Sequence, residues 1–251
     1  MTIKTRKISD WLSANGQTIT NASKATMEDA IRTDIGQLYD GVFIMFHRKN
    51  DNYPLAVRVG SWASYQTSGE IAEGVLLVEG GRHLVIAPTE ASSVKWSSKP
   101  VSSSDTSGSV QISGVTTTDD RITALNDFAG RANTTAIING STSSNVTNTE
   151  DYAAGFCNRY SRTNANGNGL TAGRWWLPSI GEMAMIWANF DKINYALSKI
   201  SGASQLQTTW YWTSTQDSAI FAWGLYLTDG GVYGHSKFDQ GRVRPVSAFL
   251  Y

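Results

Sequence analysis

Residues 174–249 are the most informative part of the chain, and three segments of this region read RWWLPSIGEMAMIW (174–187), WYWTST (210–215) and AWGLYLTDGGVYGHSKFDQGRVRPVSAF (222–249). Trp, Leu, Val and Arg recur as a framework suited to one fixed structure. Gly, Tyr, Thr, His, Ser, Phe, Asp and Gln fill the positions between them in no chemical order. An active site requires particular groups at particular places, whereas a binding surface that varies requires only the framework. The stretch therefore favours a binding face over a catalytic site.

The segment Leu225–Tyr233 is predicted to form a β-hairpin, because its Asp-Gly-Gly turn readily supplies positive φ. Side chains alternate between the two faces of a strand. One face of the first strand has the character of a protein core and carries Trp223, Leu225 and Leu227. The other face has no shared chemistry and carries Gly224, Tyr226 and Thr228. This second face is predicted to meet solvent or a ligand.

Strands are also predicted upstream, where the segments 41–48, 53–62 and 74–90 are rich in β-formers and Glu79-Gly-Gly-Arg is a hairpin turn. The Ser-rich segment 97–113 is predicted to be a surface loop. Helices are predicted at 118–128 (with Ile122, Leu125 and Phe128 as apolar residues), at 151–160, and after Pro178. In the last of these, Ser179 and Glu182 have the spacing of a capping box.

The first 40 residues differ from the rest of the chain. Met27, Ile31, Ile35 and Leu38 follow each other at spacings of three and four, which predicts a short amphipathic helix. A stripe this narrow is rarely stable alone in water. We expect residues 1–40 to be a helical attachment or oligomerisation segment, and residues 41–251 to be the ligand-binding domain. A homotrimer is one arrangement that would give this helix partners.

Composition excludes several classes of protein. The 251 residues carry 21 basic and 21 acidic side chains, so no long-range attraction to nucleic acid or anionic membranes is expected. No apolar run approaches the roughly 20 residues that span a bilayer. The N-terminal sequence MTIKTRKISDW lacks the apolar region of a secretion signal. Cys157 is the single cysteine, so an intrachain disulfide is excluded.

The quoted motifs resemble the C-terminal signature of the C-type-lectin-fold variable proteins of diversity-generating retroelements, in particular those of gut Bacteroides and their prophages. GVLLVEGG, DRITALNDFAGRANTTAII and YAAGFCNRYSRTNANGNGLTAGRWWLP are also similar, so the resemblance covers about residues 70–250. It implies an α+β, C-type-lectin-like fold of the subtype shared with formylglycine-generating enzymes. In such proteins a reverse transcriptase rewrites chosen codons, and the rewritten positions line the ligand-binding face.

Two sets of residues follow from the resemblance, within a variable region of about 210–245. The implied scaffold is Trp212, Ser214, Trp223, Leu225, Leu227, Arg242, Val243, Arg244 and Pro245. The implied variable, ligand-binding positions are Gln216, Asp217, Ile220, Phe221, Gly224, Tyr226, Thr228, Gly231, Tyr233, Gly234, His235, Ser236, Phe238, Asp239 and Gly241. The outward row of the hairpin, which the strand period selected separately, falls within the second set.

Catalytic and metal sites are not expected. An oxidase of the formylglycine-generating type would need active-site cysteines, and Cys157 reads as a buried structural thiol. His47, His83 and His235 are scattered, which argues against zinc. The EPN, QPD and WND tripeptides of calcium-dependent lectins do not occur in the sequence. Arg242 and Arg244 read as carboxylate partners or stacking residues rather than as a phosphate site.

The sequence therefore predicts a non-catalytic protein, without cofactor or metal, that binds a bacterial surface protein or glycan. A phage tail-fibre tip or a cell-surface adhesin would suit it, placed in a virion or at the cell surface by a route without a signal peptide. Two alternatives stay open. One is a structural subunit of a fibre or pilus tip, in which neighbours bury the aromatic face. The other is an enzyme related to the oxidases of the same fold.

Overall fold

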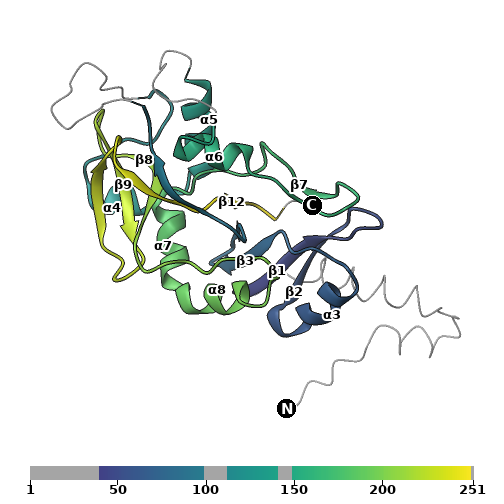
Figure 1. Ribbon diagram of the computed structural model, residues 1–251. Helices are drawn as coiled ribbons and strands as arrows, with labels where there is room; N and C mark the ends of the chain where they lie inside the picture. Colours follow the sequence, from purple (N-terminus) through teal and green to yellow (C-terminus); the bar gives the residue numbers. More distant parts are fainter. Residues whose placement is uncertain (1–39, 99–111, 141–148, 250–251) are drawn as a thin grey trace, which may run out of the picture. The chain divides into compact units, whose positions relative to one another are not determined.

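The computed structural model describes residues 40–98, 112–140 and 149–249, all of which belong to one compact unit that begins at Asp40 (Figure 1). The helix predicted at Met27–Leu38 lies outside the described residues, as does most of the predicted Ser-rich loop. The described unit is an α+β structure built mostly from antiparallel sheets, with short helices between them.

The first sheet has the strand order β12-β4-β3-β1-β2 within the described residues, and each neighbouring pair is antiparallel. Gly80 and Gly81 both have positive φ between β3 and β4, so the predicted hairpin turn is confirmed. The bounds of the strands are β1 Gly41–His47, β2 Pro54–Arg58, β3 Gly74–Glu79, β4 Arg82–Ile86 and β12 Val246–Ser247.

The strand expected to run to Trp62 ends earlier. After Arg58 the chain forms a short 3-10 turn and then helix α3, Trp62–Thr67. The helix lets the Trp62 ring pack against Phe46 of β1, with ring centroids 5.4 Å apart, and Trp62 is fully buried. Burying this large ring outweighs the strand preference of the preceding residues.

The second sheet has the order β10-β9-β8-β11-β5 among the described strands. β8 and β11 are parallel, whereas the other neighbouring pairs are antiparallel. The β9–β10 hairpin is confirmed, with Gly230 at a φ of 75° in its turn. The bounds are β5 Ala91–Lys95, β8 Trp210–Gln216, β9 Phe221–Tyr226, β10 Val232–Ser236 and β11 Gln240–Val243. A separate small hairpin joins β6 Arg162–Thr163 to β7 Gly169–Leu170.

Several predicted helices are confirmed, whereas α3, α5 and α8 were not predicted as separate helices. The capping box of Ser179 and Glu182 is present at the start of α7, and α6 lies within the predicted segment 151–160. α5 was not predicted, because its Gly start and Thr-Thr pair weaken the helix pattern. Ile122 was expected to be an apolar contact of α4 but is 72% exposed. The helices are α4 Arg121–Leu125, α5 Gly130–Asn139, α6 Ala153–Arg159, α7 Ile180–Ala188 and α8 Phe190–Leu197.

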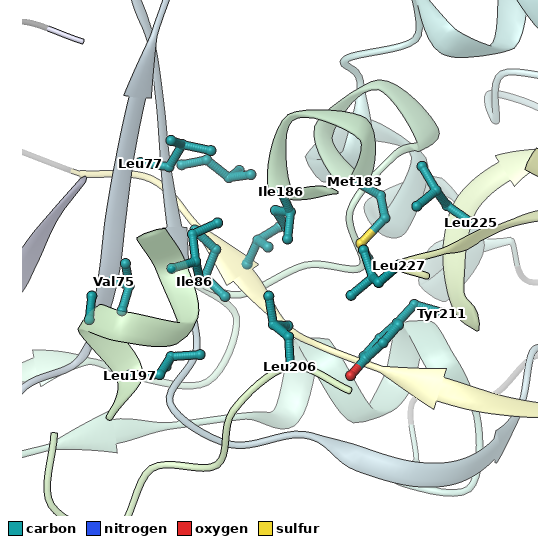
Figure 2. Packing of buried hydrophobic residues seen from close by; sticks show 14 of the residues in the cluster. Val75, Leu77, Ile86, Met183, Ile186, Leu197, Leu206, Tyr211, Leu225 and Leu227 are labelled. Atoms are coloured by element: carbon teal, nitrogen blue, oxygen red, sulfur yellow. The ribbon is translucent and has the colours of Figure 1, made fainter. Parts of the chain in front are cut away.

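The main hydrophobic core joins the two sheets through α7 and α8 (Figure 2). Leu77 and Ile86 enter it from the first sheet, Met183 and Ile186 from α7, and Leu225 from the second sheet. Each fully buried side chain of this size contributes about 1.5–3 kcal/mol relative to an exposed one. One face of the hairpin strand β9 thus packs in the main core, while Ala222 on its other face joins a second buried cluster with Trp212 and Val243.

Two chain crossings connect the sheets, and an ion-pair network joins them. β4 and β5 follow each other in sequence but lie in different sheets, and so do β11 and β12. Glu90, in the first crossing, accepts hydrogen bonds from Tyr211 Oη and from the guanidinium groups of Arg242 and Arg244, each at 2.7 Å. Arg244 is fully buried and also donates to the carbonyl oxygen of Ala87 at 2.9 Å. The predicted carboxylate pairing of both arginines is confirmed.

Candidate functional site

A cluster of rings covers the face of the second sheet that points away from the main core. The strand register pairs Tyr233 with Gly224 and Trp210 with Tyr226, so their side chains share one face of neighbouring strands. The Trp210 and His235 rings stack with centroids 4.0 Å apart and planes within 4°. Tyr226 contacts both Tyr233 and His235, each with centroids 5.7 Å apart. We call Trp210, Tyr226, Tyr233 and His235 the aromatic face.

The aromatic face is open to solvent and lies beside buried residues of the same sheet face. Tyr233 is 52% exposed, while the other three rings are half-buried. The strand register pairs His235 with Ala222 and Trp212 with Gly224, so Ala222 and Trp212 share the face of the rings, and both are fully buried. Trp212 Nε1 donates to the carbonyl oxygen of Val94 at 2.9 Å. Rings that are fixed by buried neighbours and remain partly exposed offer a large contact area at low entropic cost, as the rings of antibody paratopes do.

Two glycines make room for these rings. A Cβ at Gly224 would lie 2.8 Å from His235 Cδ2, and a Cβ at Gly241 would lie 2.5 Å from the Trp210 ring. Both glycines are buried, although they were expected among the ligand-contacting positions. These two glycines are therefore not part of the exposed surface, because the space beside them is filled by the protein's own Trp210 and His235.

His235 is held as a neutral imidazole. Burial lowers its pKa from the ordinary value, while the nearby Asp239 carboxylate opposes this shift. Its Nε2 atom is buried and has no hydrogen-bond partner among the described residues. Neutral His235 therefore serves as a flat ring on Trp210, and its unpartnered nitrogen is a cost to folding.

Two further predicted positions are not on the surface. Gln216 is fully buried, where its Oε1 accepts from Lys237 Nζ at 2.7 Å and from the backbone N–H of Ile112 at 3.3 Å. Ser236 is 5% exposed. Their expected solvent exposure is wrong. β8 turns the Gln216 side chain towards Lys237 and the loop at Ile112, and the Ser236 side chain is buried as well.

The remaining predicted positions form two groups beyond the aromatic face. Thr228 and Gly231 lie at the tip of the β9–β10 hairpin, and Gly234 is exposed next to the Asp217 carboxylate. The others are half-buried at the opposite end of the hairpin, around Lys237, and comprise Asp217, Ile220, Phe221, Phe238 and Asp239. Burial lowers the pKa of Lys237 to about 7 and raises that of Asp217. None of these residues joins the ring cluster.

Sequence reasoning missed Trp210 and Arg121 as members or neighbours of the site. The guanidinium of Arg121 in α4 lies over the Tyr233 ring, 5.9 Å from its centroid. The alternation along WYWTST places Trp210 and Trp212 on one face of β8, so the sequence did contain a signal that could have identified Trp210 as part of the site. Nothing in the sequence indicates Arg121, since its contact depends on how α4 packs.

Most of the implied scaffold positions are buried, whereas Arg242 is partly exposed. Trp212, Ser214, Val243 and Arg244 are fully buried, and Trp223, Leu225 and Leu227 are at most 5% exposed. Trp223 Nε1 donates to the carbonyl oxygen of Thr118 at 2.8 Å, which fixes β9 against the start of α4. The core row predicted for the hairpin is therefore confirmed, whereas of the predicted outward row Tyr226 and Thr228 retain access to solvent and Gly224 is buried.

Potentially reactive residues outside the aromatic face have structural roles. Cys157 is fully buried, and burial raises the pKa of its thiol. His47 is buried and its Nδ1 lies 2.8 Å from Glu73 Oε1. Within residues 40–98, 112–140 and 149–249, no group of His, Cys, Asp or Glu has the geometry of a metal site. Across the same residues, no helix is long and apolar enough to cross a membrane.

Comparisons with known proteins give little further information. The chain matches no protein-family profile and no curated protein. Among solved structures, it is similar to a fimbrial protein from Bacteroides ovatus, with a TM-score of 0.45 and 18% sequence identity. The match covers 66% of this chain and 36% of that protein, so the chain spans about a third of its length. At this TM-score, the likeness carries no functional conclusion.

Proposed function

We propose that the protein is a non-catalytic binding protein that attaches to a bacterial surface molecule through the aromatic face. The observation that carries the proposal is the arrangement of Trp210, Tyr226, Tyr233 and His235 as mutually packed, partly exposed rings beside fully buried Trp212 and Ala222. Aromatic side chains dominate the energetics of many interfaces. Tyr233 and Tyr226 are the proposed main contacts.

The proposal includes the C-type-lectin-like fold and diversification by a retroelement. Its support is the sequence resemblance, together with the separation of the hairpin into a buried scaffold row and an outward row that includes Tyr226. We propose Tyr226, Tyr233, Thr228 and His235 as positions at which siblings differ. A phage tail-fibre tip or a cell-surface adhesin is the proposed setting, and trimers would strengthen weak individual contacts.

The non-catalytic assignment rests on the chemistry of the face. Its titratable imidazole is neutral, buried at Nε2 and occupied by stacking on Trp210. A general base needs an accessible nitrogen within hydrogen-bond reach of a substrate proton. The Tyr226 and Tyr233 hydroxyls offer polar contacts, but no nucleophile with an adjacent base lies among these rings.

The test is binding of the purified protein to whole cells of a panel of gut Bacteroides strains. The double variant Tyr226→Ser/Tyr233→Ser is expected to lose about tenfold or more in apparent affinity, because removing interface rings commonly costs 2 kcal/mol or more, roughly. The variant should remain folded, as shown by an unchanged circular dichroism spectrum.

The matched control is Tyr195→Ser. Tyr195 is 57% exposed on α8 and has a cation–π contact with Lys199, much as Tyr233 has with Arg121. It lies outside the aromatic face, so the control should bind every strain as the wild type does. Equal strain profiles for wild type and the double variant would refute the proposed binding face.

A further inference from the structure

A cavity of about 370 Å³ lies next to the aromatic face, where β8 begins beside β11 and β5. This volume is within the roughly 300–1,000 Å³ typical of pockets for small ligands. Trp210 is both a member of the aromatic face and a wall of the cavity. The lining residues are Ser92, Gln207, Thr208, Thr209, Trp210, Gln240, Gly241 and Arg242.

The charge of this cavity is close to neutral. Arg242 is the charged residue in the lining, and its Nη1 atom is paired with Glu90 Oε1 at 2.7 Å. The lining contains no Asp or Glu. An anionic ligand would require an unpaired cation, and a cationic ligand would require a carboxylate in the wall. The cavity is therefore suited to an uncharged ligand.

Several polar groups in the wall are available to such a ligand. The hydroxyl groups of Ser92, Thr208 and Thr209 form no hydrogen bond with any described residue. Gln240 Oε1 accepts from Ser93 Oγ, which leaves its Nε2 as a donor, and Gln207 Nε2 donates to the carbonyl oxygen of Gln205 at 2.9 Å, which leaves its Oε1 as an acceptor. Hydroxyl and amide groups together supply both donors and acceptors.

We propose that this cavity binds a neutral sugar ring of a surface glycan. The hydroxyl groups of a pyranose would exchange hydrogen bonds with Thr208, Thr209 and Gln240. One face of the Trp210 ring is already stacked on His235, so only the part of the ring left open would meet the C–H groups of the sugar. A mostly polar wall of uncharged donors and acceptors matches a sugar better than a peptide, whose apolar side chains would need several apolar walls. The proposal rests on the proposed function, since it names the ligand class at one end of the aromatic face.

The first experiment uses an array of neutral and anionic oligosaccharides and the purified protein. The wild type is expected to bind a subset of neutral glycans. The double variant Thr208→Ala/Gln240→Ala should bind them about tenfold or more weakly, because it removes hydrogen-bonding groups from the cavity. Both residues are exposed, so the variant is expected to fold normally.

The matched control is Thr171→Ala/Gln205→Ala, which changes an exposed threonine and an exposed glutamine outside the cavity lining. Its array profile should equal that of the wild type. Array binding that is confined to anionic glycans, or that persists unchanged in Thr208→Ala/Gln240→Ala, would overturn the sugar assignment.

A second experiment separates this inference from the proposed function. Cells are treated either with periodate, which cleaves the vicinal diols of sugars, or with protease, before the strain-binding assay. Loss of binding after periodate supports the sugar site. Binding that survives periodate, is lost after protease and still depends on Tyr226 and Tyr233 would overturn the sugar site and leave the aromatic face intact. Failure of the wild type to bind both the array and the cells would overturn both proposals.

Discussion

At the scale of single residues, Glu182 caps helix α7 with a buried carboxyl group, and burial disfavours the ionised form of that group. Its Oε2 accepts hydrogen bonds from the backbone N–H of Ser179 at 2.9 Å and from Trp176 Nε1 at 3.1 Å. Burial raises its pKa from 4.5 to about 7, against the lowering effect of these hydrogen bonds. The folded protein thus holds a proton that the unfolded chain releases above a pH of about 4.5.

Replacing Glu182 with Gln is expected to change how stability depends on pH. Because the folded-state pKa is raised, the free energy of unfolding falls as the pH rises from 4.5 to about 7. Gln keeps the capping oxygen but does not ionise. Glu182→Gln should therefore remove this slope and raise the free energy of unfolding at pH 8 by about 1–3 kcal/mol.

Urea denaturation at a series of pH values measures this effect. Glu150→Gln, at an exposed position, is the control and should keep the slope of the wild type. A slope between pH 4.5 and 7 that is the same in Glu182→Gln as in the wild type would show that Glu182 is ionised in the folded protein.

At the scale of elements, β8, β9 and β11 hold the aromatic face through close packing of rings on glycine. A Cβ at Gly241 would lie 2.5 Å from Trp210 ring carbons and 3.0 Å from Trp212 Nε1. Both rings are rigid, so the sheet cannot accept the added methyl group without moving Trp210. The sheet therefore requires glycine at these positions to accommodate its own rings, independently of any ligand.

Gly241→Ala is accordingly expected to destabilise the protein by about 1–3 kcal/mol, the usual cost of overpacking. Displacement of Trp210 should also alter the near-ultraviolet circular dichroism spectrum. Gly60→Ala is a suitable comparison, because a Cβ there would meet nothing within 4 Å. If the two variants unfold at the same urea concentration, Gly241 is free to vary, as the sequence resemblance implied.

At the scale of the whole molecule, the core and the aromatic face occupy opposite faces of the same hairpin. Trp223 and Leu225 join the main core, whereas Tyr226 and Tyr233 lie on the aromatic face. Changes at the two tyrosines should leave the main core intact. Under the proposed function, the protein would present different surfaces on one framework.

This separation predicts unequal effects of substitution on unfolding. Tyr226→Ser/Tyr233→Ser together should lower the free energy of unfolding by less than about 1.5 kcal/mol, because both rings retain access to solvent. Trp212→Ala should lower it by about 3–5 kcal/mol, since the ring is fully buried. Urea denaturation compares them directly, and equal losses would place the tyrosines in the core.

The strands and the hairpin register could be predicted from the sequence, because alternation and turn glycines are local properties. The capping box of Ser179 and Glu182 was predictable for the same reason. Three features depend on tertiary packing and were not predictable: the helix at Trp62, the exposure of Ile122, and the burial of Gln216 against Lys237. For the candidate site, the period of two identified Tyr226, but the stacking of His235 on Trp210 required the structure.

The two chain crossings between the sheets affect how the protein folds during translation. Among the described strands, β5 is hydrogen-bonded only to β11, and β12 is hydrogen-bonded to the edge of β4 that faces away from β3. Strands synthesised early therefore wait for partners that follow 145 to 162 residues later, from Lys95–Gln240 to Val85–Ser247, and such distant pairings form slowly. Until translation passes Ser247, β4 and β5 present open edges and their apolar side chains to other chains in the cell. The nascent protein should accordingly depend on chaperones that shield these edges, and the risk of aggregation should be greatest just before synthesis reaches β11.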